Sequence, residues 1–334
     1  MKVVGCLAVL LVVSLGGNGC GGGSSGPLTV YSGREEELVA PLFEMFTEET
    51  GIEVEVRYGD SAELAATIAE EGENSPAEVF WAQDPGSLGA VEEYLEPLSD
   101  GVLGRVPERF RDRDGRWVGT SGRSRVLVYN TDALTESEVP TSVFELTDPR
   151  WKGRIGIAPT NASFQAFVTA MRLTEGDEAT RQWLLDLRAN DPKEYEKNTP
   201  IVEATATGEI DLGLVNHYYL YLVEQEQPDA PIANHFLEAG DPGALVSVAG
   251  AGVLGSAGDP AEAERFIEFL LSPTAQRFYV DEAEEAEYPL VDGIEPKEGL
   301  PPLDELEGPN VDLTSFGAEH EATIELLRET GYLT

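Results

Sequence analysis

This chain of 334 residues contains few cysteines and few histidines. Its two cysteines, Cys6 and Cys20, both lie near the N-terminus, so the processed chain would carry no disulfide. His235 and His320 have no cysteine or carboxylate partners at the spacing of a metal site, so we expect both at the surface. These absences exclude a disulfide framework and a zinc site built from cysteine and histidine.

Basic residues are also scarce. The chain has 22 lysines and arginines against 62 acidic residues, a formal net charge of −40. A field of this sign repels nucleic acids and anionic lipid surfaces, so we expect neither as a partner. It favours cations, but the acidic residues are scattered along the chain, which is equally typical of adaptation for solubility or high salt.

No segment beyond the N-terminal region is long and apolar enough to cross a membrane. The N-terminal region itself has Lys2 before the apolar run 3–15, which is typical of a secretory signal. We predict a signal peptide over residues 1–19 and a flexible tether over 20–27, rich in glycine and serine. Cys20 is then the residue that a bacterial lipoprotein would acylate, with plain secretion as the alternative.

Catalytic motifs are missing too. The chain has no Gly-x-Ser-x-Gly, no His-Glu-x-x-His and no Walker phosphate loop. Gly250, Gly252 and Gly255 have the spacing of a dinucleotide fingerprint, but no helix is indicated until Pro260, so we interpret them as part of a strand. We therefore do not expect an enzyme.

The remaining pattern alternates strands with helices, which predicts an α/β fold with parallel or mixed sheets flanked by helices. The length favours two lobes. Predicted strands cover 28–31, 52–56, 79–81, 124–129, 153–158, 209–215 and 244–254, and the longer predicted helices cover 35–50, 61–71, 164–173 and 260–271. Ligands of such sheets bind at the carboxyl ends of strands, here at 32–35, 83–85, 160–163 and 216–219.

The last of these loops carries two adjacent tyrosines, Tyr218 and Tyr219, at the exit of a buried strand. Phenolate oxygen is a hard anionic donor that suits ferric iron. The alternative is a pair of half-buried core aromatics. We interpret His217 beside them as a solvated neighbour and not a ligand. Arg123 and Arg125 form either an anion clamp or a structural ion pair at a hinge strand.

Several segments in order resemble the periplasmic ferric-iron-binding proteins, solute-binding proteins that supply ABC importers. They are 29–33 (TVYSG), 71–80 (EGENSPAEVF), 121–129 (SGRSRVLVY), 151–156 (WKGRIG), 208–211 (GEID), 216–219 (NHYY), 241–246 (DPGALV) and 287–290 (EYPL). The resemblance implies a two-lobe periplasmic-binding-protein (type II) fold with hinge strands between the lobes. By this comparison residues 28–124 and 248–299 form lobe 1, and 125–247 and 300–334 form lobe 2.

The resemblance also implies a function. The chain would be an exported periplasmic or cell-surface monomer, held at the membrane only by a lipid on Cys20. It would capture Fe³⁺ and deliver it to a permease in the inner membrane. In that family two tyrosines bind the iron, often with a histidine, a glutamate and an exogenous anion such as phosphate or carbonate.

Residue by residue, the tyrosine pair falls on Tyr218 and Tyr219, the histidine position on Glu35, and the glutamate position on Gln83 with Asp84 beside it. The anion positions fall on Asn161, Ala162, Ser163, Asn198 and Asn216, and we add Arg123 as a candidate anion-binding residue. Two phenolates and one carboxylate would balance the three charges of the ion. A visible charge-transfer band on addition of ferric citrate is the expected sign of this chemistry.

Two other functions remain open. The same fold could bind an organic anion, such as a phosphonate, a sugar phosphate or a polycarboxylate. The absence of the family's histidine and glutamate favours this reading. A sensor ectodomain is the third, but the chain contains no transmembrane or kinase segment that would favour it.

Overall fold

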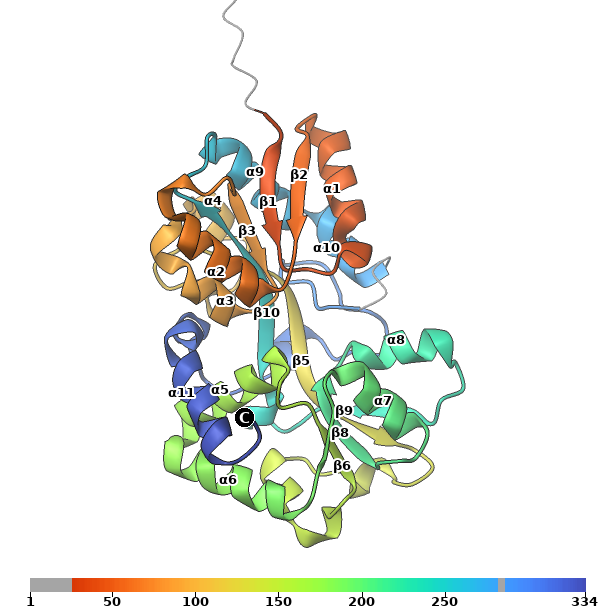
Figure 1. Ribbon diagram of the computed structural model, residues 1–334. Helices are drawn as coiled ribbons and strands as arrows, with labels where there is room; N and C mark the ends of the chain where they lie inside the picture. Colours follow the sequence, from red (N-terminus) through yellow and green to blue (C-terminus); the bar gives the residue numbers. More distant parts are fainter. Residues whose placement is uncertain (1–25, 282–285) are drawn as a thin grey trace, which may run out of the picture.

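The computed structural model describes residues 26–281 and 286–334. Strands and helices alternate along the chain, and helices lie on both faces of the sheets (Figure 1), which confirms the predicted α/β architecture. The predicted signal peptide and Cys20 lie outside the described residues. Within residues 26–281 and 286–334, no helix has both the length and the hydropathy that a bilayer crossing requires.

Ten strands and eleven α-helices make up the described part of the chain. The strands are β1 (Leu28–Ser32), β2 (Val54–Tyr58), β3 (Val79–Ala82), β4 (Leu95–Glu96), β5 (Val118–Asn130), β6 (Ile155–Ile157), β7 (Lys193–Glu194), β8 (Leu212–Asn216), β9 (Ile232–His235) and β10 (Val246–Leu254). The helices are α1 (Glu36–Thr50), α2 (Ser61–Glu71), α3 (Pro85–Ala90), α4 (Asp100–Leu103), α5 (Ala162–Glu175), α6 (Asp177–Ala189), α7 (Asn198–Ala206), α8 (Tyr219–Glu226), α9 (Pro260–Leu270), α10 (Pro273–Asp281) and α11 (Phe316–Glu329).

Two mixed sheets share the long strand β5. The continuous strand order is β2-β1-β3-β10-β5-β8-β6-β7, with β4 beside β10 and β9 beside β5. The first half of β5 pairs with β10 up to Ser124, and the second half pairs with β8 and β9 from Arg125 onward. Figure 1 shows β5 and β10 running between two bodies. The upper body contains β1–β3, α1–α4, α9 and α10, and the lower body contains β6, β8, β9 and α5–α7. The residue boundaries given above for the two lobes stay a prediction.

Each body has its own apolar core. In the upper one Phe43 stacks on Phe266 at 5.2 Å and meets Trp81 edge-on at 5.7 Å. In the lower one Phe167 lies edge-on to Trp183 at 5.5 Å. Such aromatic pairs contribute about 1 kcal/mol each beyond the area they bury, so they help to stabilise each core.

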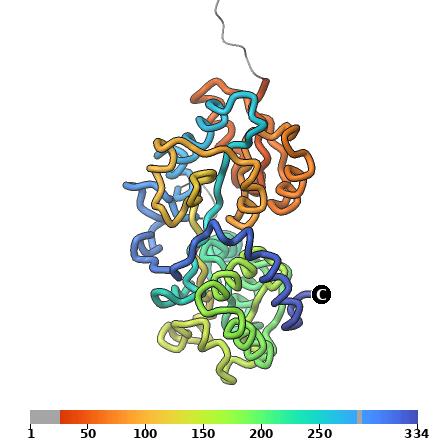
Figure 2. Tube along the Cα trace, turned by 90° about the vertical axis from the view of Figure 1, so that its left-hand side faces the viewer, coloured from red at the N-terminus to blue at the C-terminus, as the bar shows by residue number. Residues whose placement is uncertain are grey.

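The C-terminal helix α11 joins the two bodies a second time. It packs against α3 of the upper body and α5 of the lower one, and Figure 2 shows the C-terminal segment crossing the waist of the molecule. On α5, Arg172 pairs with Glu319 at 3.1 Å and Thr169 bonds Thr323 at 2.8 Å. The helix α11 therefore links the two bodies in addition to the two long strands.

Some elements differ from the sequence prediction. β5 begins at Val118, six residues earlier than predicted, and the helices α3 and α8 were not predicted. Tyr219–Glu226 is rich in aromatic residues and has no side-chain N-cap, so it lacks the usual signal of a helix start. Gly250 and Gly252 lie within β10, as predicted, and not in a phosphate-binding loop.

Candidate functional site

The tyrosine pair lies where β8 meets α8. All five residues of β8 are buried, and the chain enters α8 three residues after Asn216. Tyr218 is 1% exposed and Tyr219 is half-buried. Their rings lie 4.3 Å apart with an angle of 31° between the planes. The two side chains are thus side by side at a strand-to-helix junction, where the backbone of the first helical turn holds them.

A buried guanidinium stands next to this pair. Arg125 of β5 is 1% exposed, and burial lowers its pKa to about 9, while Tyr219 and Tyr218 act in the opposite direction. Its Nη2 donates to the carbonyl oxygen of Leu214 at 2.9 Å. None of the ion pairs found among the described residues involves Arg125. A buried cation without a carboxylate is costly, so negative charge near the two phenols would stabilise it.

The predicted anion loop also contacts Arg125. Its Nη1 donates to Ser163 Oγ at 3.0 Å and, more weakly, to Asn216 Oδ1 at 3.5 Å. Asn161 caps α5, and its Oδ1 accepts from the backbone N–H of Ser163 at 3.0 Å. Asn198, the first residue of α7, donates from Nδ2 to Asn161 Oδ1 and to Ser163 Oγ, each at 3.2 Å.

The structure therefore brings Asn161, Ser163, Asn198 and Asn216 together around Arg125. Ala162 is exposed as the first residue of α5. The N-termini of α5 and α7 meet here, and helix N-termini favour anions because their first N–H groups have no partner within the helix. Asn198 is 1% exposed and its Oδ1 has no hydrogen-bond partner among the described residues. Chemically, the cluster offers several N–H donors and one cation to an oxyanion.

Arg123 does not join this cluster. It is buried, and its Nε donates to Glu287 Oε1 at 2.7 Å while Nη1 donates to the carbonyl oxygen of Gln83. Of the two readings left open from the sequence, the ion pair describes Arg123, whereas Arg125 contacts the predicted anion loop. An anion-binding role for Arg123 stays a prediction.

The candidates from the upper body lie on two separate loops. Glu35 is exposed just before α1, and its side chain caps no backbone N–H. Gln83 is half-buried, and its Oε1 has no hydrogen-bond partner within the part of the chain that the structure describes. Asp84 caps α3 by accepting from Ser87 N at 2.9 Å and Ser87 Oγ at 2.8 Å. Glu35 is therefore the carboxylate available for a ligand, whereas both oxygens of Asp84 are engaged locally.

The predicted environment of His217 is wrong. The side chain is 0% exposed, because β5 and the segment after residue 285 cover it. Nδ1 accepts from the backbone N–H of Ser124 at 3.2 Å, so Nε2 carries the proton and donates to the Ala286 carbonyl at 3.0 Å. Burial lowers its pKa to about 4, so the ring is neutral at pH 7. Both ring nitrogens are engaged, in agreement with the expectation that His217 is not a ligand.

The other two histidines differ from each other. His320 is exposed, as predicted. His235 at the end of β9 is half-buried, and its Nε2 has no hydrogen-bond partner among the described residues. Within the same part of the chain, no three histidine, cysteine, aspartate or glutamate side chains are grouped as a metal site. A metal bound at this junction would therefore depend on the tyrosine oxygens.

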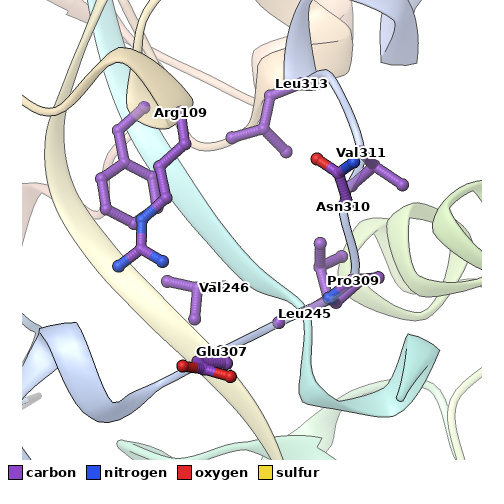
Figure 3. A pocket seen from close by; sticks show the side chains of 10 residues that line it. Arg109, Leu245, Val246, Glu307, Pro309, Asn310, Val311 and Leu313 are labelled. Carbon is purple, nitrogen blue, oxygen red and sulfur yellow. The ribbon is translucent and has the colours of Figure 1, made fainter. Parts of the chain in front are cut away.

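Two cavities lie elsewhere. The larger, of about 230 Å³, is shown in Figure 3, where Arg109 and Glu307 lie on one side and Asn310 and Leu313 on the other. The second, of about 200 Å³, is lined by residues of α8 and β9 and by Leu300. Neither is lined by Tyr218 or Tyr219, so we define the candidate site by its convergent polar side chains.

Comparisons with known proteins agree with one another. The model of a family described as bacterial extracellular solute-binding proteins matches residues 74–305. The major ferric iron-binding protein of Neisseria meningitidis serogroup B is 36% identical over 313 residues, covering 91% of this chain and 92% of that protein. The Fe(3+)-binding periplasmic protein of Serratia marcescens is 32% identical over 310 residues, covering 92% and 90%.

Solved structures give the same picture. Iron-bound HitA from Pseudomonas aeruginosa superposes with a TM-score of 0.85 at 34% identity, covering 92% of this chain and all of that one. The Trichodesmium protein IdiA (FutA), in complex with iron and citrate, superposes with a TM-score of 0.81 at 28% identity, with the same coverage.

Proposed function

Because the chain belongs to the bacterial extracellular solute-binding protein family, we propose that it captures ferric iron between its two lobes for an ABC importer. The observation that carries this proposal is the pair of adjacent tyrosines beside the buried guanidinium of Arg125. The names of the relatives, which describe proteins that bind Fe(3+), support it.

In the proposed complex Tyr218 and Tyr219 bind the ion as phenolates. A trivalent cation displaces phenolic protons and prefers hard oxygen donors. Ionisation of the phenols places negative charge next to Arg125, which has no carboxylate partner among the described residues. The ion brings three positive charges against two phenolates, so a carboxylate and an exogenous anion are needed to balance the charge beside the guanidinium.

The remaining donors come from the upper body and from an anion. Glu35 supplies the third negative charge, and Gln83 supplies a neutral carbonyl oxygen. Asp84 remains the helix cap of α3 and contributes to the iron only if that cap opens. A phosphate or carbonate ion occupies the cluster of Asn161, Ala162, Ser163, Asn198 and Asn216, with Arg125 as its charged partner.

The cellular role follows from the same family. We expect the exported chain to act as a monomer in the periplasm or at the cell surface and to release its iron to a permease in the inner membrane. Whether a lipid on Cys20 holds it at the membrane can be read from the mass of the purified N-terminus. An acylated Cys20 adds the mass of the lipid, and plain secretion does not.

A second function is favoured by the same guanidinium. Arg125 with Ser163 and Asn198 offers donors that could bind an organic oxyanion, such as a phosphonate or a sugar phosphate, without any metal. In that case the tyrosines would only pack against the ligand or donate hydrogen bonds to it.

One titration separates the two functions. Ferric nitrilotriacetate and, separately, a phosphonate are added to metal-free protein while absorbance and tryptophan fluorescence are recorded. We expect an orange to red band with the iron chelate, lost in Tyr218→Phe and in Tyr219→Phe. The band should persist in Tyr195→Phe, whose hydroxyl bonds Glu209 away from the site. Saturation by the phosphonate with no band from iron would establish the second function instead.

A further inference from the structure

The segment Ala286–Tyr288 contacts two of the three loops that carry the proposed iron donors and reaches the third, at Gln83, through Arg123. Its backbone pairs with β5, where Gly122 N donates to Tyr288 O at 2.8 Å and Tyr288 N donates to Gly122 O at 2.9 Å. This bridge lies two residues before Ser124, where β5 changes its partner from β10 to β8. The segment is thus fixed to the strand that joins the two bodies.

Glu287 connects this segment to the upper body. The side chain is 0% exposed, and its carboxylate accepts from Arg34 Nη1 at 3.1 Å and Arg34 Nη2 at 2.9 Å. It also accepts from Arg123 Nε at 2.7 Å. Arg34 directly precedes Glu35, and Arg123 donates to the carbonyl oxygen of Gln83. One carboxylate therefore holds both loops of the upper body that carry proposed donors.

Ala286 connects the same segment to the tyrosine pair. Its carbonyl oxygen accepts from Nε2 of His217 at 3.0 Å, and His217 directly precedes Tyr218. The imidazole also packs on the ring of Tyr288, with centroids 4.8 Å apart. Because Ala286 and Glu287 are consecutive, a movement of one contact is transmitted to the other through a single peptide unit.

We propose that Ala286–Tyr288 is a tie that sets the position of the upper-body donors relative to the tyrosine pair, with Glu287 as its positioning residue. The proposal rests on the proposed function for its effect on iron and adds residues that would not touch the ion. Its physical basis is geometric. Three hydrogen bonds from two planar guanidinium groups fix one carboxylate, and neutral glutamine cannot satisfy both cations.

A purely structural ion pair is the competing explanation. It would stabilise the upper body without changing the geometry of the iron site. The two explanations differ in which loops become less ordered when the Glu287 carboxylate is removed. The tie predicts simultaneous loosening at Arg34–Glu35, at Gln83 and at His217–Tyr219. A local ion pair predicts loosening only near its two arginines, at Arg34–Glu35 and at Gln83.

The first test uses the iron-free chain, so it does not depend on iron binding. Amide hydrogen exchange is measured by mass spectrometry in wild type, Glu287→Gln and the control Asp211→Asn, which removes the carboxylate paired with Arg154 in the lower body. We expect exchange to accelerate roughly tenfold or more in all three loops of Glu287→Gln and in none of them in the control. Unchanged exchange at His217–Tyr219 would overturn the tie, whether one or both upper loops accelerate.

The second test measures ferric affinity and the position of the visible band. Groups behind a metal ligand typically change affinity by about 10–100-fold when removed, so we expect Glu287→Gln to weaken iron binding by at least about tenfold and to shift the band. Binding within about twofold of wild type would refute the positioning role. A wild-type chain with no band would refute the proposed function, and the exchange result would still decide the tie.

His217 variants cover the case in which Glu287→Gln does not fold. In His217→Gln the amide nitrogen can still donate to the Ala286 carbonyl, whereas in His217→Asn the shorter amide can accept only from Ser124 N–H. The tie predicts that His217→Gln retains the wild-type band and slow exchange while His217→Asn loses both. Equal behaviour of the two variants would contradict it.

Discussion

Replacement of Glu287 by glutamine should destabilise the protein strongly at neutral pH and much less in acid. The carboxylate is fully buried between Arg34 and Arg123. The variant keeps the shape of the side chain but leaves two buried cations with only a neutral partner. Removing one member of a buried ion pair typically costs about 3–5 kcal/mol, because the remaining charge is uncompensated.

The pKa of Glu287 gives a second, independent value for the free energy of unfolding that its carboxylate contributes. Burial alone would raise this pKa, but Arg34 and Arg123 lower it from 4.5 to about 2. As pH falls below 4.5, Glu287 becomes protonated in the unfolded chain but stays ionised in the folded chain. The stability from this group is therefore complete above pH 4.5 and is lost as pH falls through 2. At about 1.4 kcal/mol per pKa unit, it amounts to roughly 3 kcal/mol at pH 7 and about half of that at pH 3.

Urea denaturation followed by tryptophan fluorescence measures this difference. We expect Glu287→Gln to lose about 3 kcal/mol of unfolding free energy relative to wild type at pH 7 and about 1–2 kcal/mol at pH 3. Comparison with wild type at each pH cancels the titration of the other acidic residues. A difference below about 1 kcal/mol at pH 7, or one that grows on acidification, would show that the carboxylate is not held as an anion by the two arginines.

Three further predictions concern other parts of the molecule. A Cβ at Gly317 would lie 2.8 Å from backbone atoms of Gly89 on α3, so Gly317→Val should cost about 1–3 kcal/mol in urea denaturation. Gly101→Ala, whose Cβ has only ordinary contacts, should not lower stability. Glu35→Gln should weaken ferric binding at least about tenfold in a titration. Asp84→Asn should change ferric affinity less than about threefold and lower only stability, because it removes a helix cap. The reverse order of affinities would make Asp84 the ligand. Arg125→Gln should reduce the dependence of ferric affinity on added phosphate or carbonate, measured as the ratio of dissociation constants with and without the anion; an unchanged ratio would place the anion elsewhere.

Local signals allowed much of the fold to be predicted. The helix α2 has the predicted bounds, because Asp60 caps it through Ala62 and Glu63, and Gly72 ends it. The apolar run ending at Asn216 placed the tyrosines correctly at the exit of a buried strand. The likeness to solved structures confirms the predicted two-lobe periplasmic-binding-protein (type II) fold.

The parts that sequence reasoning missed depend on contacts between distant residues. Arg123 and Arg125 lie two residues apart, yet Arg123 pairs with Glu287 and Arg125 bonds Ser163. Nothing in their local sequence distinguishes them. His217 is buried by the carbonyl of Ala286, 69 residues later in the chain. Its neutral ring is therefore a consequence of the tertiary structure and could not be read from its neighbours.

The most direct test of the central claim is diffraction at the iron absorption edge from crystals of the iron-loaded protein. The account predicts one strong anomalous peak bonded to the hydroxyl oxygens of both Tyr218 and Tyr219, on the side that faces Arg125. A peak bonded to neither tyrosine, or iron held only by surface carboxylates while the two phenols remain hydrogen-bonded inside the protein, would contradict it.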